Sequence, residues 1–428
     1  MKTTMVMALV LLGAWTFAVA AEDKPAPGAA VAAESATETA TPATWANSPI
    51  GRPDFFPLCV WLQRVDKIAA YKAIGINTYV ATWQGPNEEE LAALKAGGMY
   101  FVSDMNEVAL KHLDDPTIIA WIHDDEPDNA REMEKFWKND LEAVKKAWPD
   151  LPEKSLEKWG QYGPPMSPKM IQDRYKEIKA KDATRPVWVG CGQGVAWEAY
   201  KGRGVRTGKL EDYPEYIKGG DIVSFDIYPV VHKSPEVKGK LEYVARGIDR
   251  LMTWTEGRKP VYSAIECTRI GNAEVKPTPE QTKTEVWMAI VHGARGILYF
   301  CHQFAPTRIS AGLLADEEMC KMVAEVNRQI TQLAPVLNSP TAKDAATVAS
   351  SNADVPIDIL VKRQGDDVYI FAVAMRDAAA KGTFTVAGAT GGKVEVLGEN
   401  RTIDLADGKF ADEFKGYDVH LYKVTPAK

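Results

Sequence analysis

The chain has 428 residues and a formal net charge of -7, and its hydrophobic (46%) and charged (25%) fractions are ordinary for a globular protein. The length exceeds that of one average domain and predicts two. The negative charge argues against a nucleic-acid-binding surface, so we expect neutral rather than anionic partners.

Residues 1–20 have the pattern of a signal peptide. Lys2 supplies a positive charge, an apolar region follows, and Ala18-Val19-Ala20 is a small-x-small cleavage site. The apolar region is too short to span a bilayer comfortably, and no later run approaches the roughly 20 apolar residues of a membrane span. We therefore expect no membrane span and an exported protein, periplasmic or secreted. Residues 21–47, rich in Ala, Pro, Thr and Glu, predict a disordered leader.

Eight short apolar runs rich in β-forming residues then alternate with helical stretches. The runs occupy residues 55–63, 75–84, 98–107, 117–127, 185–194, 221–230, 259–268 and 296–304. Helices are predicted over residues 64–73, 88–95, 130–147, 168–181, 235–255 and 279–292. This alternation predicts a (β/α)8 TIM barrel over residues 48–340, with a doubly wound open sheet as the competing fold.

The pattern changes near residue 341. Alternating strands joined by Gly, Asp and Asn turns continue without a helical period, and they predict a small C-terminal β-sandwich over residues 341–428. Five cysteines without paired spacing indicate buried free thiols rather than a disulfide framework.

In a TIM barrel the active site is built at the carboxyl ends of the strands. The fourth run ends in Asp124, Asp125 and Glu126, and the seventh ends in Glu266. Strand alternation places Glu266 on the inward face, where an unused carboxylate would be costly to desolvate. Two carboxyls that face one pocket suit glycoside hydrolysis, one as nucleophile and the other as acid and base.

These strand ends resemble those of the TIM-barrel clan of retaining β-glycoside hydrolases, the β-galactosidase and cellulase-like superfamily. The stretch "DDEP" at Glu126 resembles the clan's Asn-Glu-Pro at the end of strand four, and "AIEC" at Glu266 lies at the end of strand seven. The resemblance implies that Glu126 is the acid/base and Glu266 the nucleophile. It implies cleavage of β-linked glycans by double displacement, without a metal or another cofactor.

The remaining candidates are side chains suited to binding a carbohydrate. Carboxylates and tyrosine bind sugar hydroxyls, and aromatic faces stack on sugar rings. The predicted substrate-binding residues are Asp125, Asp226, Tyr228, Trp61, Trp83, Trp159, His302 and Gln303.

Three other interpretations stay open. Glu126 would be a first-turn acid if Pro127 began a helix, and Glu266 would be structural if it paired with Arg269 or Arg295. The barrel would be a catalytically silent carbohydrate-binding protein if Asp125, where the clan has Asn, abolishes turnover. Acids and histidines at the strand ends, His123 and His302 among them, could instead form the metal site of a metal-assisted hydrolase.

Overall fold

The structure is a computed structural model that describes residues 44–427 except 84 and 157–160. The predicted signal peptide, the leader up to residue 43 and Trp159 lie outside the described residues. Residues 44–47, predicted as the end of the leader, lie against the barrel, where the Asn47 backbone N–H donates to the Thr184 carbonyl at 3.2 Å. Among the described residues, we find no helix with both the length and the apolar character needed to cross a membrane.

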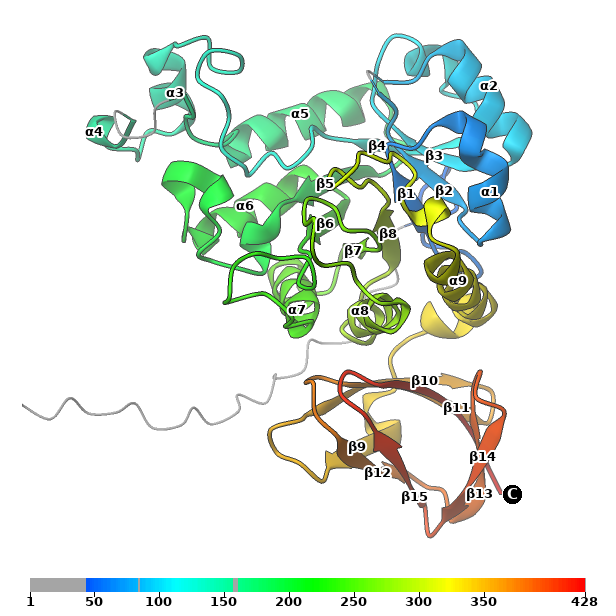
Figure 1. Cartoon of the computed structure of the whole chain (residues 1–428). Helices are drawn as coiled ribbons and strands as arrows, with labels where there is room; N and C mark the ends of the chain where they lie inside the picture. Colours follow the sequence, from blue (N-terminus) through cyan, green and yellow to red (C-terminus); the bar gives the residue numbers. More distant parts are fainter. Residues whose placement is uncertain (1–43, 84, 157–160, 428) are drawn as a thin grey trace, which may run out of the picture. The chain divides into compact units, whose positions relative to one another are not determined.

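Eight parallel strands close into a barrel in chain order (Figure 1). The strands are β1 (Leu58–Trp61), β2 (Thr78–Val80), β3 (Tyr100–Ser103), β4 (Ile118–Ile122), β5 (Val187–Cys191), β6 (Ile222–Asp226), β7 (Val261–Glu266) and β8 (Gly296–Phe300). Pairing of Leu58 with Ile297 joins β1 to β8 and closes the ring. Each of the eight predicted runs forms one strand, so the TIM-barrel prediction is confirmed.

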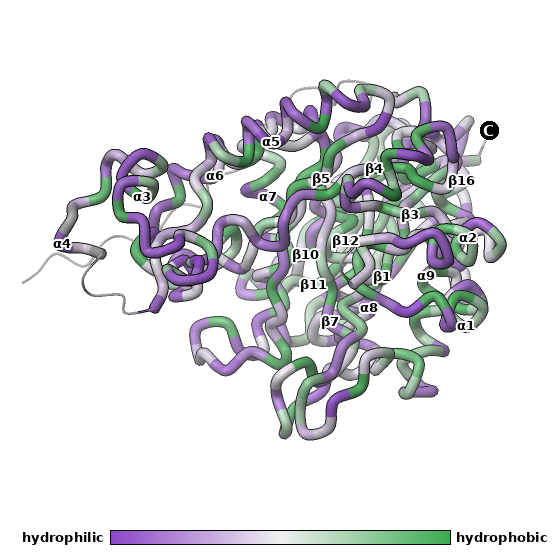
Figure 2. Tube along the Cα trace, turned by 90° about the horizontal axis from the view of Figure 1, so that it is seen from above, coloured by the Kyte–Doolittle hydropathy of each residue, from purple (hydrophilic) through white to green (hydrophobic). Residues whose placement is uncertain are grey.

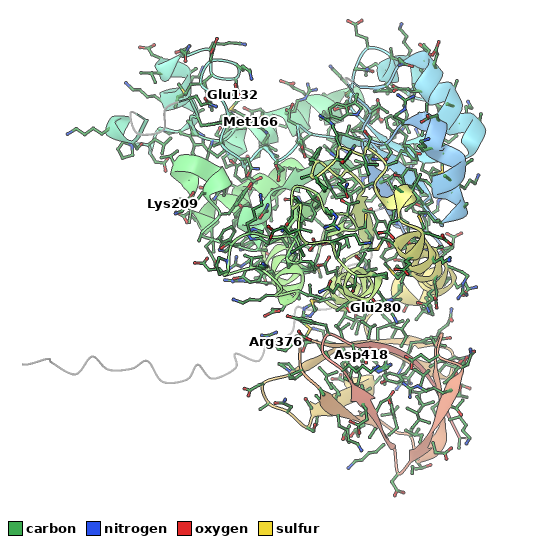
Figure 3. All side chains as sticks on the ribbon, viewed as in Figure 1. Glu132, Met166, Lys209, Glu280, Arg376 and Asp418 are labelled. Atoms are coloured by element: carbon green, nitrogen blue, oxygen red, sulfur yellow. The ribbon has the colours of Figure 1, made fainter. Side chains whose placement is uncertain are left out.

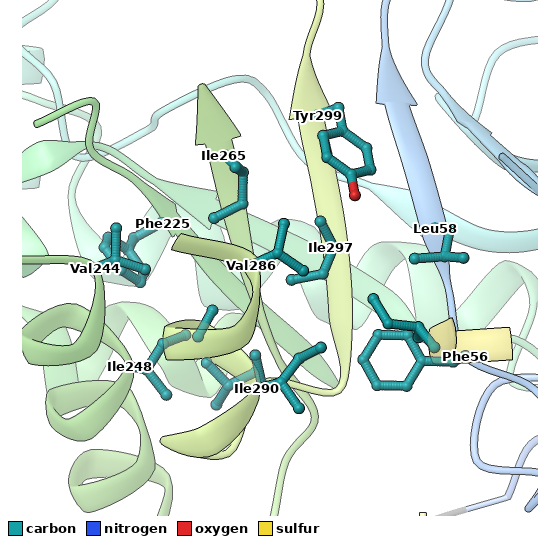
Figure 4. Packing of buried hydrophobic residues seen from close by; sticks show 14 of the residues in the cluster. Phe56, Leu58, Phe225, Val244, Ile248, Ile265, Val286, Ile290, Ile297 and Tyr299 are labelled. Atoms are coloured by element: carbon teal, nitrogen blue, oxygen red, sulfur yellow. The ribbon is translucent and has the colours of Figure 1, made fainter. Parts of the chain in front are cut away.

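Strand alternation gives the barrel two apolar layers. Tyr262 and Ala264 of β7 belong to the core inside the barrel. Ile265 and Ile297 point outward and pack with Val286 of the helix that follows β7 (Figure 4). Every strand is therefore buried on both faces, which explains why the runs are almost continuously apolar.

Among the described residues, the helices over 153–156, 213–216 and 317–337 were not predicted, and two predicted helices begin several residues later than expected. The helices are α1 (Ile68–Ala73), α2 (Glu88–Gly97), α3 (Leu141–Ala147), α4 (Glu153–Leu156), α5 (Pro168–Lys181), α6 (Tyr213–Tyr216), α7 (Glu242–Thr255), α8 (Pro279–Val291) and α9 (Glu317–Leu337). The helix predicted over 130–147 begins only at Leu141, because Lys138 and Asn139 adopt positive φ angles and Asp140 caps α3. The helix predicted from residue 235 begins at Glu242, after a turn in which Gly239 has a φ of 76°.

The long connection from β4 to α5 folds into an excursion with its own small core of Trp137, Val144 and Trp148. The backbone of Glu132, labelled in Figure 3, forms an isolated antiparallel β-bridge with the backbone of Tyr162. Trp137 and Trp148 donate their indole N–H groups to the carbonyls of Pro164 and Pro165 at 2.9 and 2.8 Å. Figure 2 shows that hydrophilic residues predominate on this excursion, whereas apolar residues follow the barrel strands.

The C-terminal domain is all-β, as predicted. Its strands are β9 (Ala346–Ser350), β10 (Ile357–Gln364), β11 (Asp367–Ala374), β12 (Ala380–Val386), β13 (Gly391–Val396), β14 (Arg401–Ala406), β15 (Lys409–Phe414) and β16 (Val419–Pro426). The predicted sandwich takes the form of one eight-stranded sheet in the order β10-β11-β16-β13-β14-β15-β12-β9. Phe384, Phe410 and Tyr422 pack together in its core.

Helix α8 joins this sheet to the barrel. The ring of Trp287 stacks on Phe371 of β11, with centroids 5.7 Å apart and an interplanar angle of 8°. The Thr284 hydroxyl donates to the Tyr417 carbonyl at 2.6 Å, and the Tyr417 hydroxyl donates to Glu242 at 2.6 Å. The two domains therefore share apolar and polar contacts.

His292, at the end of α8, lies between a carboxylate of the barrel and one of the C-terminal domain, so its stabilising ionic contacts depend on pH. It lies 2.8 Å from Asp249 of α7 and 3.2 Å from Asp358 of β10. Although burial opposes the charge, the two carboxylates raise the pKa of His292 to about 9. The stabilisation is fully present below the unfolded pKa of about 6.5 and is lost as the pH rises through about 9.

We expect His292→Gln to lower the free energy of unfolding by about 1–2 kcal/mol at pH 6 and by much less at pH 10, with the partners' exposure limiting the effect. Urea unfolding at both pH values measures this difference. His112→Gln, which removes a more exposed His–Glu pair with Glu88, is the matched control. Equal losses for His292→Gln at pH 6 and pH 10 would contradict the assignment.

Candidate active site

A cavity of about 320 Å3 opens at the carboxyl ends of the barrel strands. Its polar lining residues are His123, Asp124, Asp125, Glu126, Gln193, Tyr200, Ser224, Asp226 and Tyr228. Its apolar walls include Trp61, Trp188, Phe225 and Phe300. This combination of convergent carboxyls and aromatic rings is what a carbohydrate site requires.

Two carboxyls meet in this cavity, Glu126 after β4 and Asp226 at the end of β6. They lie within hydrogen-bonding reach of one another. Burial, followed by the negative charge of Asp226, raises the pKa of Glu126 well above its usual range. Burial raises the pKa of Asp226 to about 7. Such a pair shares one proton between its two carboxyls near neutral pH, and Glu126 binds this proton more tightly than Asp226 does.

The backbone around Glu126 is built to hold its carboxyl in place. Glu126 has a φ of 40°, which is uncommon for a residue with a side chain. Its Oε2 accepts a hydrogen bond from the Asn129 side chain at 2.7 Å. A Cβ on Gly192 would lie only 2.8 Å from Glu126 Oε1, so glycine after β5 makes room for the carboxyl. The alternative interpretation in which Pro127 begins a helix is wrong, since the described chain has no helix between β4 and Leu141.

The side chain of Asp128 holds the turn after Glu126 in place. It is fully buried and accepts hydrogen bonds from the Gly192 backbone N–H at 2.8 Å and from the Tyr213 hydroxyl at 2.9 Å. Its carboxylate lies 3.9 Å from the guanidinium of Arg203, which also pairs with Asp212 at 2.8 Å. A buried ionic network therefore fixes the two residues that follow Glu126.

Asp226 is supported from its own strand and from its neighbours. The Tyr228 hydroxyl lies near the Asp226 carboxyl and favours its ionised form, while Asp226 Oδ1 has no hydrogen-bond partner among the described residues. Two residues before Asp226, on the same face of β6, the Ser224 hydroxyl accepts a hydrogen bond from the Trp188 indole N–H at 2.7 Å. Asp226 therefore lines the cavity and carries a buried carboxyl oxygen that has no donor among the described residues.

Glu266 does not line this cavity, although strand alternation predicted that it would face Glu126. Its side chain is fully buried and accepts hydrogen bonds from the backbone N–H groups of Val230 and Val231 at 2.6 and 3.0 Å. It also lies beside Glu285 of α8, and burial raises the pKa of Glu266 to about 7. The last residue of β7 turns towards the loop after β6, which supplies the amide donors that the carboxylate needs.

The other predicted binding residues divide into two groups. Asp125, Asp226, Tyr228 and Trp61 line the cavity. His302 lies behind Trp61, 3.1 Å from its carbonyl, and Trp83 is 60% exposed with its ring edge towards His302. Gln303 lines a different cavity, and its amide donates to the Thr307 carbonyl at 3.0 Å.

Several cavity residues escaped the sequence analysis, and three of them are instructive. Trp188 lies inside β5, Gln193 is the first polar side chain after β5, and Tyr200 lies on the following loop. The position of Gln193 at a strand end was a usable signal. Tyr200 could not be found from sequence, because its hydroxyl reaches Asn129 (3.4 Å) across 71 residues of chain.

The predicted metal set is not assembled in the part of the chain that the structure describes, where no group of three or more His, Cys, Asp or Glu is arranged to hold a metal ion. His123 Nε2 contacts the Gly219 carbonyl at 2.7 Å. Burial lowers the pKa of His123, so this imidazole is neutral at pH 7. All five cysteines are free thiols.

Comparison with known proteins identifies the fold. No family model matches the chain, and no curated protein matches its sequence. Among solved structures, a GH42 beta-galactosidase from G. stearothermophilus matches with a TM-score of 0.54 and 10% identity, over 89% of this chain and 99% of that chain. An alpha-amylase from Geobacillus thermoleovorans in complex with acarbose matches with a TM-score of 0.51 and 12% identity, over 90% and 100%.

The chain has the fold of the TIM-barrel glycoside hydrolases. This finding confirms the resemblance at the level of the fold. Because the matches include both an alpha-amylase and a beta-galactosidase, the fold does not select a linkage.

Proposed function

We propose that this protein is a glycoside hydrolase whose catalytic carboxyls are Glu126 and Asp226. The observation that carries the proposal is the proton-sharing pair at the carboxyl end of the barrel, beside Tyr228 and the aromatic walls. A carboxyl that keeps its proton at neutral pH is suited to protonate a leaving group, and an adjacent ionised carboxyl is suited to attack. The likeness in fold to glycoside hydrolases supports this assignment.

The two residues take different roles in the proposed reaction. Glu126 holds its proton more strongly, so it protonates the glycosidic oxygen as that oxygen departs. Asp226 attacks the anomeric carbon and forms a glycosyl ester, and Glu126 then removes a proton from the water that releases the sugar. Retaining enzymes hold their carboxyls about 5–5.5 Å apart and inverting enzymes about 6.5–9.5 Å. Carboxyls in contact are closer than either separation, so they must move apart to admit the glycosidic oxygen, and retention needs the smaller movement.

Glu266 takes a positioning role in this proposal. Its two hydrogen bonds hold the backbone of Val230 and Val231, which follow Tyr228 on the same loop. The β-linkage implied by the sequence resemblance and export after cleavage near Ala20 are retained as parts of the proposal.

The cavity also favours neutral substrates over acidic ones. Asp124, Asp125, Glu126 and Asp226 line it, and no Lys or Arg of the described part of the chain does. A carboxylate on the substrate would meet like charges in a partly desolvated site. We expect an aryl hexuronoside to be cleaved with a kcat/KM at least about tenfold below that of the matching neutral aryl hexoside. Equal or faster cleavage of the uronoside would contradict this description of the cavity.

A panel of aryl α- and β-glycosides and oligosaccharides, followed by NMR of the product anomers, tests the proposed function. We expect hydrolysis of at least one neutral glycoside with net retention. Saturable glycan binding without turnover of any member would favour the silent carbohydrate-binding barrel instead.

A further inference from the structure

A second cavity, of about 90 Å3, lies at the opposite end of the barrel, beside the amino ends of β7 and β8. The residues after α8 and α9, the segment 50–57 and β10 of the C-terminal domain complete its walls. Its apolar lining residues include Ile50, Phe55, Met252, Ile290, Leu337 and Leu360. Four cationic residues also line it, Arg258, Lys259, Arg295 and Lys362, and no acidic residue does within the described ranges of the chain.

Arg295, Lys362 and Lys259 have no carboxylate oxygen within 4.0 Å among the described residues, and the Lys259 amine donates to the carbonyls of Ile217 and Gly220 at 2.7 and 2.6 Å. Arg295 donates from Nη1 to the Leu337 carbonyl, and no other hydrogen bond of its side chain is found among the described residues. Lys362 is 1% exposed, and its amine donates to the Ser339 carbonyl at 2.6 Å and to the Thr341 hydroxyl at 3.3 Å.

Two like charges therefore share a wall without a counter-ion. Burial, and next the charge of Arg295, lower the pKa of Lys362 to about 7, and burial lowers the pKa of Arg295. An unpaired buried charge costs several kcal/mol. Tyr262 lines the same cavity, and its buried hydroxyl also has no partner among the described residues. The polar groups of this cavity are thus incomplete within the chain.

We propose that this cavity binds a small oxyanion, which Arg295 and Lys362 hold against the apolar walls. A guanidinium carries five N–H donors in a fork that matches two oxygens of a carboxylate or phosphate. The hydrogen bonds of Arg295 to the Leu337 carbonyl and of Lys362 to the Ser339 carbonyl hold both cations at the end of α9. They leave most of the N–H donors of Arg295 without an acceptor among the described residues. The apolar walls favour a short organic carboxylate over an inorganic anion, and the site is independent of the proposed catalysis.

Isothermal titration of the full chain with propionate and with inorganic phosphate, at ionic strength fixed with chloride, tests the proposal. We expect one saturable site, and at least tenfold weaker binding in Lys362→Met and in Arg295→Gln. Arg258→Gln is the matched control, because Arg258 lines the same cavity but is paired with Glu256 and 64% exposed. Its dissociation constant should match that of the wild type.

The two anions distinguish the source of the oxyanion. Propionate binding at least tenfold more tightly than phosphate assigns an organic acid, and equal binding assigns the oxyanion group alone. Tyr262→Phe keeps the packing and both charges, so a weaker dissociation constant in this variant supports the site even where a charge variant does not fold. No saturable binding of either anion to the wild type, or wild-type binding in both charge variants, would overturn the proposal.

Discussion

Asp226→Asn should lower kcat/KM by at least about 10³-fold on every glycoside that the protein cleaves, whatever the leaving group. The amide can neither attack the anomeric carbon nor carry the negative charge that the transition state needs. Asp226 lies at the end of β6, and its Oδ1 is buried without a hydrogen-bond partner among the described residues, so the substitution removes the proposed nucleophile without removing a structural hydrogen bond of that oxygen.

Glu126→Gln should behave differently, and the difference identifies the acid. A glutamine cannot protonate the departing oxygen, so turnover of natural linkages should fall by a similar factor. Aryl glycosides with acidic leaving groups need little protonation, and they should lose much less in the first step. Steady-state kinetics with a series of aryl leaving groups measures both effects.

Asp124→Asn is the control for these two variants. Asp124 follows β4, as Glu126 does, but it is exposed and does not belong to the Glu126–Asp226 pair. We expect its kcat/KM to stay within about tenfold of wild type. A larger loss in Asp124→Asn than in Asp226→Asn would place the chemistry on a different carboxyl.

Asp128→Ala should be the most destabilising of the single substitutions considered. It removes the acceptor of two buried hydrogen bonds, from Gly192 and Tyr213, and one acidic neighbour of the buried Arg203. We expect the free energy of unfolding to fall by about 2–4 kcal/mol, as measured by urea denaturation. Turnover should also fall, because Asp128 fixes the turn that carries Glu126.

Asp128→Asn separates the two contributions of this residue. The amide oxygen can still accept from Gly192 and the side-chain volume is kept, so the loss of stability should be smaller than for alanine. An Asp128→Ala variant that unfolds at the wild-type urea concentration would show that the network is not needed.

The barrel could be predicted because its signal is local. Each strand is an apolar run that ends in a polar residue, and both faces of the sheet are buried, so period and length suffice. The strand ends also brought predicted site residues together, since Glu126, Asp226 and Tyr228 all line one cavity.

The pairing of the carboxyls could not be predicted, because it depends on contacts between distant parts of the chain. The two N–H groups that turn Glu266 away belong to Val230 and Val231, more than 30 residues earlier. The geometry of Glu126 depends on its own positive φ and on Gly192 across the cavity.

The most direct test of the central claim is covalent labelling of the nucleophile. The protein would be treated with the 2-deoxy-2-fluoro glycosyl fluoride of the sugar that it cleaves, and the labelled peptide identified by mass spectrometry. We predict one glycosyl group per chain, attached to Asp226. A label on Glu266 would contradict this account and restore the assignment that strand alternation suggested.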